Sequence, residues 1–254
     1  MGKIIAIANQ KGGVGKTTTA INLSSALCFA DAKVLVVDMD PQGNATSGLG
    51  VEVADDCASI YDVLIGRADA KSTVRQTEIE NLDIIPGNIN LSAAEVELVT
   101  EMSRETKLKK ALAGVVDDYN FIMIDCPPSL GLLTVNSLTA ADSVLIPLQC
   151  EYYAMEGLGQ LLNTVRLIRE SLNEDLELEG ILLTMFDPRN NLSKEVQRQV
   201  EEYLHDSIFE TVIPRNVRLS EAPSHGESII EYDAKSKGAA SYIKLANEML
   251  GRLS

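Results

Sequence analysis

A glycine-rich stretch near the N-terminus has the residue types that bind phosphate. It reads QKGGVGKTT over residues 10–18 and directly follows a short apolar run, KIIAIA at 3–8. A phosphate loop normally reads G-x-x-x-x-G-K-[ST] between a strand and a helix, where backbone N–H groups and the helix N-terminus surround the anion. Here Gln10 occupies the position of the first glycine, and an additional lysine, Lys11, follows it. The sequence therefore predicts a phosphate loop that departs from the usual pattern.

The residues of this loop suit a nucleoside triphosphate with its metal ion. Lys16 is placed to meet the β- and γ-phosphate oxygens, and the hydroxyl of Thr17 can bind Mg2+. We expect a helix to begin near Lys16, so that its N-terminus faces the phosphates. The candidate nucleotide-binding residues of the loop are Lys11, Gly12, Gly13, Val14, Gly15, Lys16, Thr17 and Thr18.

Three aspartates stand at the ends of apolar runs, where metal and water ligands are needed. Asp38 and Asp40 end the run in VVDMD, and two residues apart on an extended chain they point to the same side. One could orient the attacking water while the other supports the metal shell or Lys16. Asp125 closes FIMID, the pattern by which phosphate-loop enzymes hold Mg2+, often through water. The candidate metal site therefore consists of Thr17, Asp38 and Asp125.

Short runs rich in β-branched residues alternate with stretches of helical spacing, one of which covers residues 103–118. Because the runs are nearly continuous in apolar residues, we expect strands covered on both faces. This order predicts an α/β fold with a doubly wound, mostly parallel sheet, helices on both faces and ligands beyond the carboxyl ends of the strands. One domain should span 1–254, although residues 50–80 follow no clear period. The predicted strands are 3–8, 33–38, 82–86, 121–125, 143–148, 180–186 and 209–214.

The composition describes an acidic chain. Over 254 residues, 37 Asp and Glu oppose 22 Lys and Arg, which gives a formal net charge of −15. Such a charge argues against a nucleic-acid binder unless a local basic patch overcomes the overall field. The N-terminal apolar run is too short for a signal sequence, and no stretch approaches about 18 uninterrupted apolar residues. We therefore expect a cytoplasmic protein, whose four widely spaced cysteines are buried reduced thiols.

Several segments together resemble a known family. KGGVGKTT at 11–18, DMDPQGNAT at 38–46 and IDCPPSLG at 124–131 are similar to the deviant phosphate-loop ATPases of the MinD/ParA class, and among them to the ParA/Soj-type chromosome-partitioning ATPases. The similarity continues through PLQCEYYAMEGL at 147–158 and IPRNVRLSEAPSHG at 213–226. The resemblance implies ATP and Mg2+ as ligands, weak intrinsic hydrolysis, and a switch from an ATP-free monomer to an ATP-bound homodimer.

The same resemblance implies roles for individual residues. Lys11 would reach across a two-fold interface to the nucleotide of the other copy, which explains the additional lysine. Asp40 would position the hydrolytic water, so that Lys11, Lys16 and Asp40 are the candidate catalytic residues. The adenine base would lie near Pro214 and Asn216.

The resemblance also implies DNA as the output of the switch. Arg189 and Arg218 match positions that contact DNA nonspecifically in ParA proteins, and Lys235 and Lys237 would extend this patch. A dimer brings two copies of a small patch together, which lets an acidic chain bind phosphates. The family further implies a ParB-like activator protein and association with the nucleoid.

Two other outputs stay open at this point. The chain could be a nucleotide-switched regulator of replication initiation or sporulation, in which slow hydrolysis acts as a timer. A MinD-like membrane ATPase would instead carry a basic amphipathic C-terminal helix. Residues 238–254 include Lys244, Glu248 and Arg252 among apolar residues at ordinary core spacing. We therefore expect a packed last helix and no membrane binding.

Overall fold

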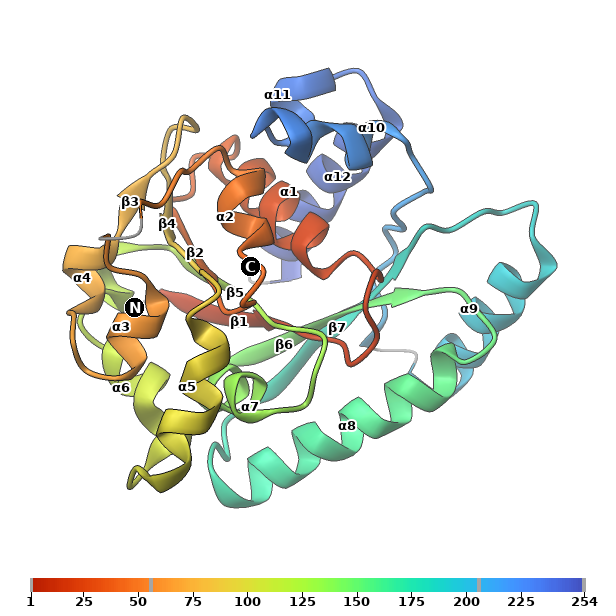
Figure 1. Ribbon diagram of the computed structural model, residues 1–254. Coiled ribbons are helices and arrows are strands. Elements are labelled where there is room, and N and C mark those ends of the chain that lie inside the picture. The colour runs from red at the N-terminus through yellow and green to blue at the C-terminus, as the bar shows by residue number, and fades with distance from the viewer. Residues whose placement is uncertain (1, 55–56, 205–206, 253–254) are drawn as a thin grey trace.

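A twisted seven-stranded sheet forms the centre of the protein (Figure 1). The structure is a computed structural model that describes residues 2–54, 57–204 and 207–252. The strand order is β3-β4-β2-β5-β1-β6-β7, and neighbours are parallel except that β3 pairs antiparallel with β4. The strands are β1 (Lys3–Ile7), β2 (Val34–Asp38), β3 (Arg75–Gln76), β4 (Leu82–Ile85), β5 (Phe121–Asp125), β6 (Ser143–Gln149) and β7 (Glu177–Thr184).

Helices cover both faces of this sheet, as the sequence predicts. The α-helices are α1 (Lys16–Cys28), α2 (Asn44–Gly48), α3 (Ile60–Leu64), α4 (Ala70–Thr73), α5 (Leu91–Glu97), α6 (Lys107–Leu112), α7 (Leu132–Ala140), α8 (Ala154–Ser171), α9 (Asn191–Leu204), α10 (Arg218–Glu221), α11 (Ile229–Asp233) and α12 (Lys237–Arg252). Short 3-10 turns are η1 (Leu98–Thr100), η2 (Arg104–Thr106), η3 (Val116–Asp118) and η5 (Ala222–His225).

The alternation of side chains along each strand divides the apolar interior into two cores. On β1, Ile4 and Ala6 belong to the core shared with α3 to α9, whereas Ile5 and Ile7 belong to the core shared with α1, α2 and α10 to α12. Successive strand residues point to opposite faces, so a strand buried on both sides must be apolar at every position. This explains why the strands read as continuous apolar runs.

The last helix is packed, as expected. The face of α12 that carries Ala239, Tyr242, Leu245 and Met249 is buried in the core on the α1 side. Tyr242 joins the two helices directly, because its hydroxyl lies 3.2 Å from the Thr19 hydroxyl. Among the described helices, none combines the length and apolar character needed to span a bilayer.

The predicted strand at 209–214 is wrong. The segment runs beside β7 and forms only isolated bridges, in which Phe209 N–H bonds to Ile181 O at 3.0 Å and Ile213 N–H bonds to Leu183 O at 2.9 Å. Between these two hydrogen bonds the segment advances by four residues, from 209 to 213, while β7 advances by two, from 181 to 183. The amides between the bridges, those of Glu210 and Thr211, donate instead to the Glu248 carboxylate of α12 at 2.8 and 2.9 Å. Because a side chain takes these donors, a continuous ladder cannot form.

Two other regions differ from the expectation based on periodicity. The helical stretch predicted over 103–118 is a short α6 between the η2 and η3 turns, and Ser103 has a positive φ of 54° where it begins. In the region without a clear period, two-residue β3 adds an antiparallel edge strand to β4. A two-residue strand is too short to show a period, so the pattern could not predict β3.

Candidate active site

The parallel sheet brings the carboxyl ends of its central strands to one edge. Asp125 at the end of β5 is the register partner of Asp38 on β2 and of Ile7 on β1. The loop at 8–15 continues from β1 into α1 at the same edge. The two aspartates and the phosphate loop, distant in sequence, therefore meet where ligands bind in sheets of this kind.

The loop has the backbone shape of an anion site. Gly13 and Gly15 have φ angles of 73° and 92°, in the left-handed region that favours glycine, and Gly15 is the N-cap of α1. Val14 between them is buried, and its carbonyl accepts a hydrogen bond from the Thr184 hydroxyl at 2.8 Å. The helix N-terminus and the amides of the loop thus face the cavity described below, where they favour negative charge.

Lys16 is buried at the start of α1 and points back along its loop. Its Nζ donates to the Lys11 carbonyl at 3.1 Å. Burial lowers the pKa of Lys16, while the nearby Asp125 and Asp40 act in the opposite direction. The ammonium is therefore a partly desolvated cation that a bound anion would stabilise.

Asp38 is held by Thr46, a residue that the sequence analysis did not select. One carboxylate oxygen of Asp38 accepts from the Thr46 amide at 2.9 Å and from its hydroxyl at 2.7 Å, and the other accepts from the Asp40 amide at 3.2 Å. The Thr46 hydroxyl in turn accepts from the Gly87 amide at 3.0 Å. Burial raises the pKa of Asp38 to about 6, against the effect of the Thr46 hydrogen bonds. Both oxygens of Asp38 are thus already engaged.

Asp125 differs from Asp38 in its hydrogen bonding. Its side chain is fully buried, and neither oxygen has a hydrogen-bond partner within the described ranges. Burial raises its pKa well above the usual range and the Asp38 carboxylate raises it further. The Thr17 hydroxyl, which is near enough to lower the pKa but does not reach hydrogen-bond geometry, and the Lys16 ammonium oppose this. An orphaned buried carboxyl with open lone pairs fits a hydrated Mg2+ ion, which prefers oxygen ligands and keeps several waters. The residues present therefore fit that ion.

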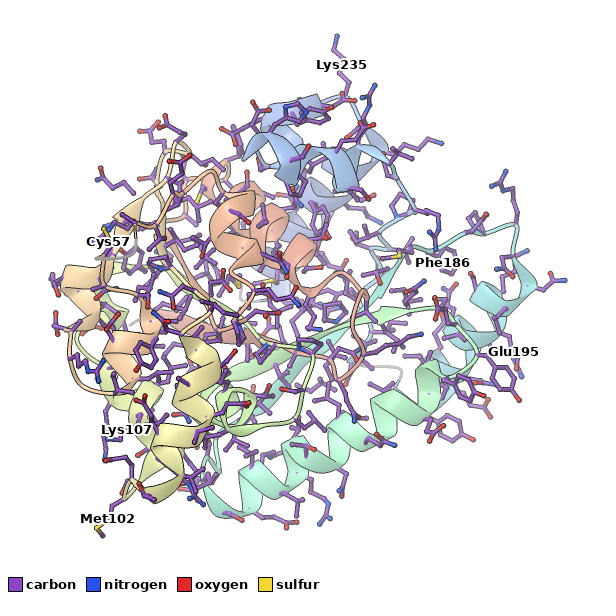
Figure 2. The ribbon with its side chains drawn as sticks, viewed as in Figure 1. Cys57, Met102, Lys107, Phe186, Glu195 and Lys235 are labelled. Atoms are coloured by element: carbon purple, nitrogen blue, oxygen red, sulfur yellow. The ribbon has the colours of Figure 1, made fainter. Side chains whose placement is uncertain are left out.

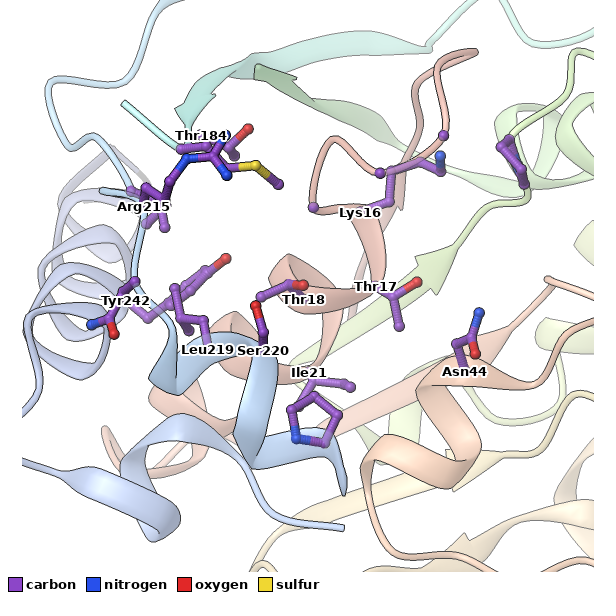
Figure 3. A pocket seen from close by; sticks show the side chains of 18 of the residues that line it. Lys16, Thr17, Thr18, Ile21, Asn44, Thr184, Arg215, Leu219, Ser220 and Tyr242 are labelled. Atoms are coloured by element: carbon purple, nitrogen blue, oxygen red, sulfur yellow. The ribbon is translucent and has the colours of Figure 1, made fainter. Parts of the chain in front are cut away.

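A cavity of about 650 Å³ opens over the loop (Figure 3). In Figure 3, Lys16, Thr17 and Thr18 line one part of the cavity, and Arg215, Leu219 and Tyr242 line another part. Of the residues predicted to bind nucleotide or to act in catalysis, those that line the cavity are Gly12, Gly13, Gly15, Lys16, Thr17, Thr18, Asp40, Pro214 and Asn216. Lys11, Val14, Asp38 and Asp125 do not line it.

Part of the cavity wall could not be predicted from the sequence. Thr184, Met185 and Tyr242 contribute from the end of β7 and from α12. They lie more than 160 residues from the loop, and nothing in their local sequence indicates a ligand site. Thr46 lies within the segment DMDPQGNAT at 38–46, but its role depends on the turn into α2, which brings its amide and hydroxyl to the Asp38 carboxylate.

Comparison with known proteins identifies the family. A protein-family model described as AAA domain matches residues 2–178. Sporulation initiation inhibitor protein Soj of Bacillus subtilis (strain 168) is 60% identical over 249 residues, which cover 98% of both chains. Chromosome-partitioning ATPase Soj of Treponema pallidum (strain Nichols) is 55% identical over 252 residues, 99% of this chain and 98% of the relative. The chain belongs to the Soj/ParA family of chromosome-partitioning ATPases.

A solved structure is similar along the whole of this Soj/ParA chain. The crystal structure of cobyrinic acid a,c-diamide synthase from Mycobacterium smegmatis with bound ATP analogue and magnesium has a TM-score of 0.87 and is 38% identical. The superposition covers 100% of this chain and 96% of that chain. The fold of the Soj/ParA chain is thus that of a phosphate-loop nucleoside triphosphatase.

The arginines predicted to contact DNA lie outside the cavity and are paired with acids. In this Soj/ParA chain, Arg189 follows β7 and makes two hydrogen bonds, both of 3.0 Å, to the Asp187 carboxylate. Arg218, at the start of α10, pairs with Glu221 at 2.8 Å and with Asp233 at 3.6 Å. Lys235 projects from the corner between α11 and α12 (Figure 2). Both arginines are exposed, and each has a carboxylate partner on the surface.

The unpartnered carboxyl of Asp125 leads to a stability prediction. A carboxyl whose folded-state pKa is raised destabilises the fold once it ionises, and this cost grows as the pH rises above its ordinary value of 3.8. In buffer containing a chelator, Asp125→Asn should therefore raise the melting temperature by about 2–4 °C at about pH 8 and by less at about pH 5. Scanning calorimetry measures both, with Asp117→Asn, an exposed carboxylate before β5, as the control. If Asp125→Asn and the native protein have the same melting temperature at both pH values, the prediction is contradicted.

Proposed function

We propose that the chain is a Mg2+-dependent partition ATPase with weak intrinsic activity. ATP binding gives a homodimer, the dimer binds DNA without sequence preference, and hydrolysis stimulated by a ParB-like protein releases it. The observation that carries this proposal is the cavity over the phosphate loop, with the buried Lys16 in its wall and the unpartnered Asp125 carboxylate beside it. We further propose that residues 1–254 act as one domain in the cytoplasm, on the nucleoid.

The loop and Lys16 would bind the triphosphate. The amides between Gly12 and Lys16, together with the N-terminus of α1, supply fixed partial positive charge at no cost in reorganisation. The Lys16 ammonium would leave the Lys11 carbonyl for a phosphate oxygen. Thr17 and Asp125 would hold Mg2+, Asp125 through water. When bound, Mg2+ neutralises charge that develops on the phosphate oxygens.

Of the two aspartates at the end of β2, Asp40 is better placed to orient a water molecule. Asp40 lines the cavity, and one of its oxygens accepts from the Gln42 amide at 2.9 Å, which fixes the carboxylate. Asp38 lies behind it and is tied by Thr46. We therefore propose that Asp40 orients the hydrolytic water and that Asp38 holds the turn that carries Asp40.

Pro214 and Asn216 would contact the adenine base. Both line the cavity at the end of the segment that follows β7. The side-chain oxygen of Asn216 accepts from the Arg218 amide at 2.9 Å, so its NH2 group is directed to other acceptors. This hydrogen bond also joins the base wall to α10, which carries a proposed DNA contact, and so gives the nucleotide a direct structural route to Arg218.

A nucleotide-switched regulator is the second candidate. The name of the Bacillus subtilis relative, a sporulation initiation inhibitor, favours it. The rate of ATP turnover, measured with DNA and a partner peptide, separates the two candidates. These additions should raise the rate for a partition ATPase and leave it unchanged for a regulator in which slow hydrolysis acts as a timer. A MinD-like membrane ATPase is less compatible with this chain, because the apolar face of α12 is used for packing on α1.

Asp40→Ala tests the switch. The variant should keep its ATP affinity, accumulate as a dimer with ATP and Mg2+, and stay monomeric with ADP. Its rate of ATP hydrolysis should fall by about 100-fold or more. Size-exclusion chromatography with light scattering measures the oligomer, and phosphate release measures turnover. In the same assays Lys16→Ala should lose nucleotide binding, and Lys11→Ala should bind ATP without dimerising. A monomeric Asp40→Ala protein in saturating ATP and Mg2+ would refute the proposal.

Arg189→Ala tests the DNA surface. Phosphate contacts release counterions, so binding by the ATP-bound dimer should weaken steeply with salt. A dimer that loses one contact per copy should lose about two units from the slope of log affinity against log salt. Fluorescence anisotropy with two unrelated duplexes measures this slope and the lack of sequence preference. Arg166→Ala, which removes an exposed arginine from an ion pair on α8, is the control. Equal binding with ADP would contradict the coupling to ATP.

A further inference from the structure

Asn22 joins the phosphate-loop helix to α11. It lies in the second turn of α1 and is 1% exposed. Its side-chain NH2 group donates to the Thr18 carbonyl at 2.7 Å, and its side-chain oxygen accepts from the amide of Ile229, the first residue of α11, at 2.7 Å. A carbonyl only accepts and a backbone N–H only donates, so both ends of the asparagine side chain are used. Because Thr18 lines the cavity, Asn22 bridges the nucleotide site and the start of α11.

A second contact fixes the same end of α11. The Ser25 hydroxyl, further along α1, donates to the Ser228 hydroxyl at 2.9 Å. Ser228 is the N-cap of α11 and forms a capping box with Glu231, which satisfies backbone groups that the first turn leaves free. A helix of five residues is too short to be stable without tertiary contacts. The place of α11 therefore depends on the two side chains of α1 that hold its N-terminus.

Helix α11 in turn surrounds Arg218 of the neighbouring helix α10 (Figure 1). The Arg218 guanidinium lies over the Tyr232 ring, 6.0 Å from its centre, and Nε lies 3.6 Å from the Asp233 carboxylate. The Tyr232 hydroxyl donates at 3.4 Å to the Glu221 carboxylate, which also accepts from Arg218 at 2.8 Å. The Arg218 amide is bonded to Asn216 in the base wall. Arg218 is thus connected with the base wall through its backbone and with the phosphate-loop helix through α11.

We propose that Asn22 is a positioning residue for Arg218, because it holds α11 in the place from which that helix orders the guanidinium. The inference rests on the proposed function, in which Arg218 contacts DNA. A guanidinium that is already ordered loses less side-chain entropy when it binds a phosphate. The turn of α1 that carries Thr18 is also the turn that a triphosphate would meet. Asn22 therefore gives the phosphate end of the cavity its own connection with the proposed DNA surface.

Asn22→Ala tests this role in full-length Asp40→Ala protein with saturating ATP and Mg2+. The variant should still dimerise, as measured by light scattering. Its affinity for a DNA duplex, measured by fluorescence anisotropy, should fall by about 5- to 100-fold, since both copies of Arg218 lose their order. An unchanged or higher affinity would overturn the inference. The control is Ser24→Ala, which removes from α1 a buried hydroxyl without a hydrogen-bond partner in the part of the chain that the structure describes, and which should leave the affinity unchanged.

A double-mutant cycle shows whether Asn22 acts through Arg218. In an Arg218→Ala background, Asn22→Ala should change the DNA affinity by less than about twofold, whereas in an Arg189→Ala background its full effect should remain. An equal effect in both backgrounds would overturn the inference, because a general loss of structure weakens every contact. Ser228→Ala disturbs α11 through its other contact with α1 and should give the same pattern. It takes the place of Asn22→Ala if that variant does not fold.

A second measurement needs neither the dimer nor DNA. In nucleotide-free protein, phenylglyoxal, which modifies arginine side chains, should label Arg218 about 2- to 5-fold faster in Asn22→Ala than in Ser24→Ala, as measured by mass spectrometry. The reason is that a displaced α11 removes two partners of the guanidinium. Equal labelling would overturn the positioning role by itself. If Arg218→Ala leaves DNA binding by the dimer unchanged, the proposed DNA contact fails instead, and the labelling still decides the inference.

Discussion

Two carboxyl groups buried side by side at the ends of β2 and β5 are the constraint around which the rest of the site is arranged. Asp38 and Asp125 are register partners in adjacent parallel strands, and both carry raised pKa values because of burial. Charge of this kind is tolerated only when it is neutralised, hydrogen-bonded or paired with a cation. The chain uses hydrogen bonds from Thr46 for one carboxyl and leaves the other open. In the proposed function, the open carboxyl is the group that a metal-bound ligand would stabilise.

The two lysines of the phosphate loop also have partners within the chain. Lys16 is bonded to a backbone carbonyl and Lys11 to a carboxylate on another loop. Each of these contacts is weak enough to be exchanged for a phosphate oxygen, so ligand binding replaces interactions without first creating bare charges. The same holds for Arg189 and Arg218, which have acidic partners on the surface. In the proposed function, such an exchange of partners would occur both at the cavity and on the outer surface.

Most of the architecture could be predicted from the sequence, for a physical reason. Strands covered on both faces are apolar at every position, which gave β1, β2 and β5 to within one residue at each end. The phosphate loop was equally clear because glycine at Gly13 and Gly15 is required by the backbone itself. The segment 209–214 has the same composition as a strand, but its amides bond to Glu248, which is far away in sequence. The pattern of neighbouring residues cannot show that a distant side chain takes the amides that a strand would need.

The candidate site divides in the same way. Residues that act through local geometry, such as Lys16 and Thr17, could be selected from their spacing. Thr46 and Thr184 act by contacting residues that lie 8 and 170 positions away. Only the folded chain brings them to their partners. The sequence therefore indicates the chemistry of the site, and the structure adds the residues that restrain it.

Helix α12 holds the segment before Pro214 in place, which affects the order in which the chain can fold during synthesis. Glu248 bonds to the amides of residues 210 and 211, and Arg252 donates to the Ile208 carbonyl at 2.9 Å and lies over the Phe209 ring. The phosphate loop leaves the ribosome first, yet the opposite wall of the cavity is held by residues that are translated about 230 positions later. The wall that carries Pro214 can therefore take its packed position only after α12 has been synthesised.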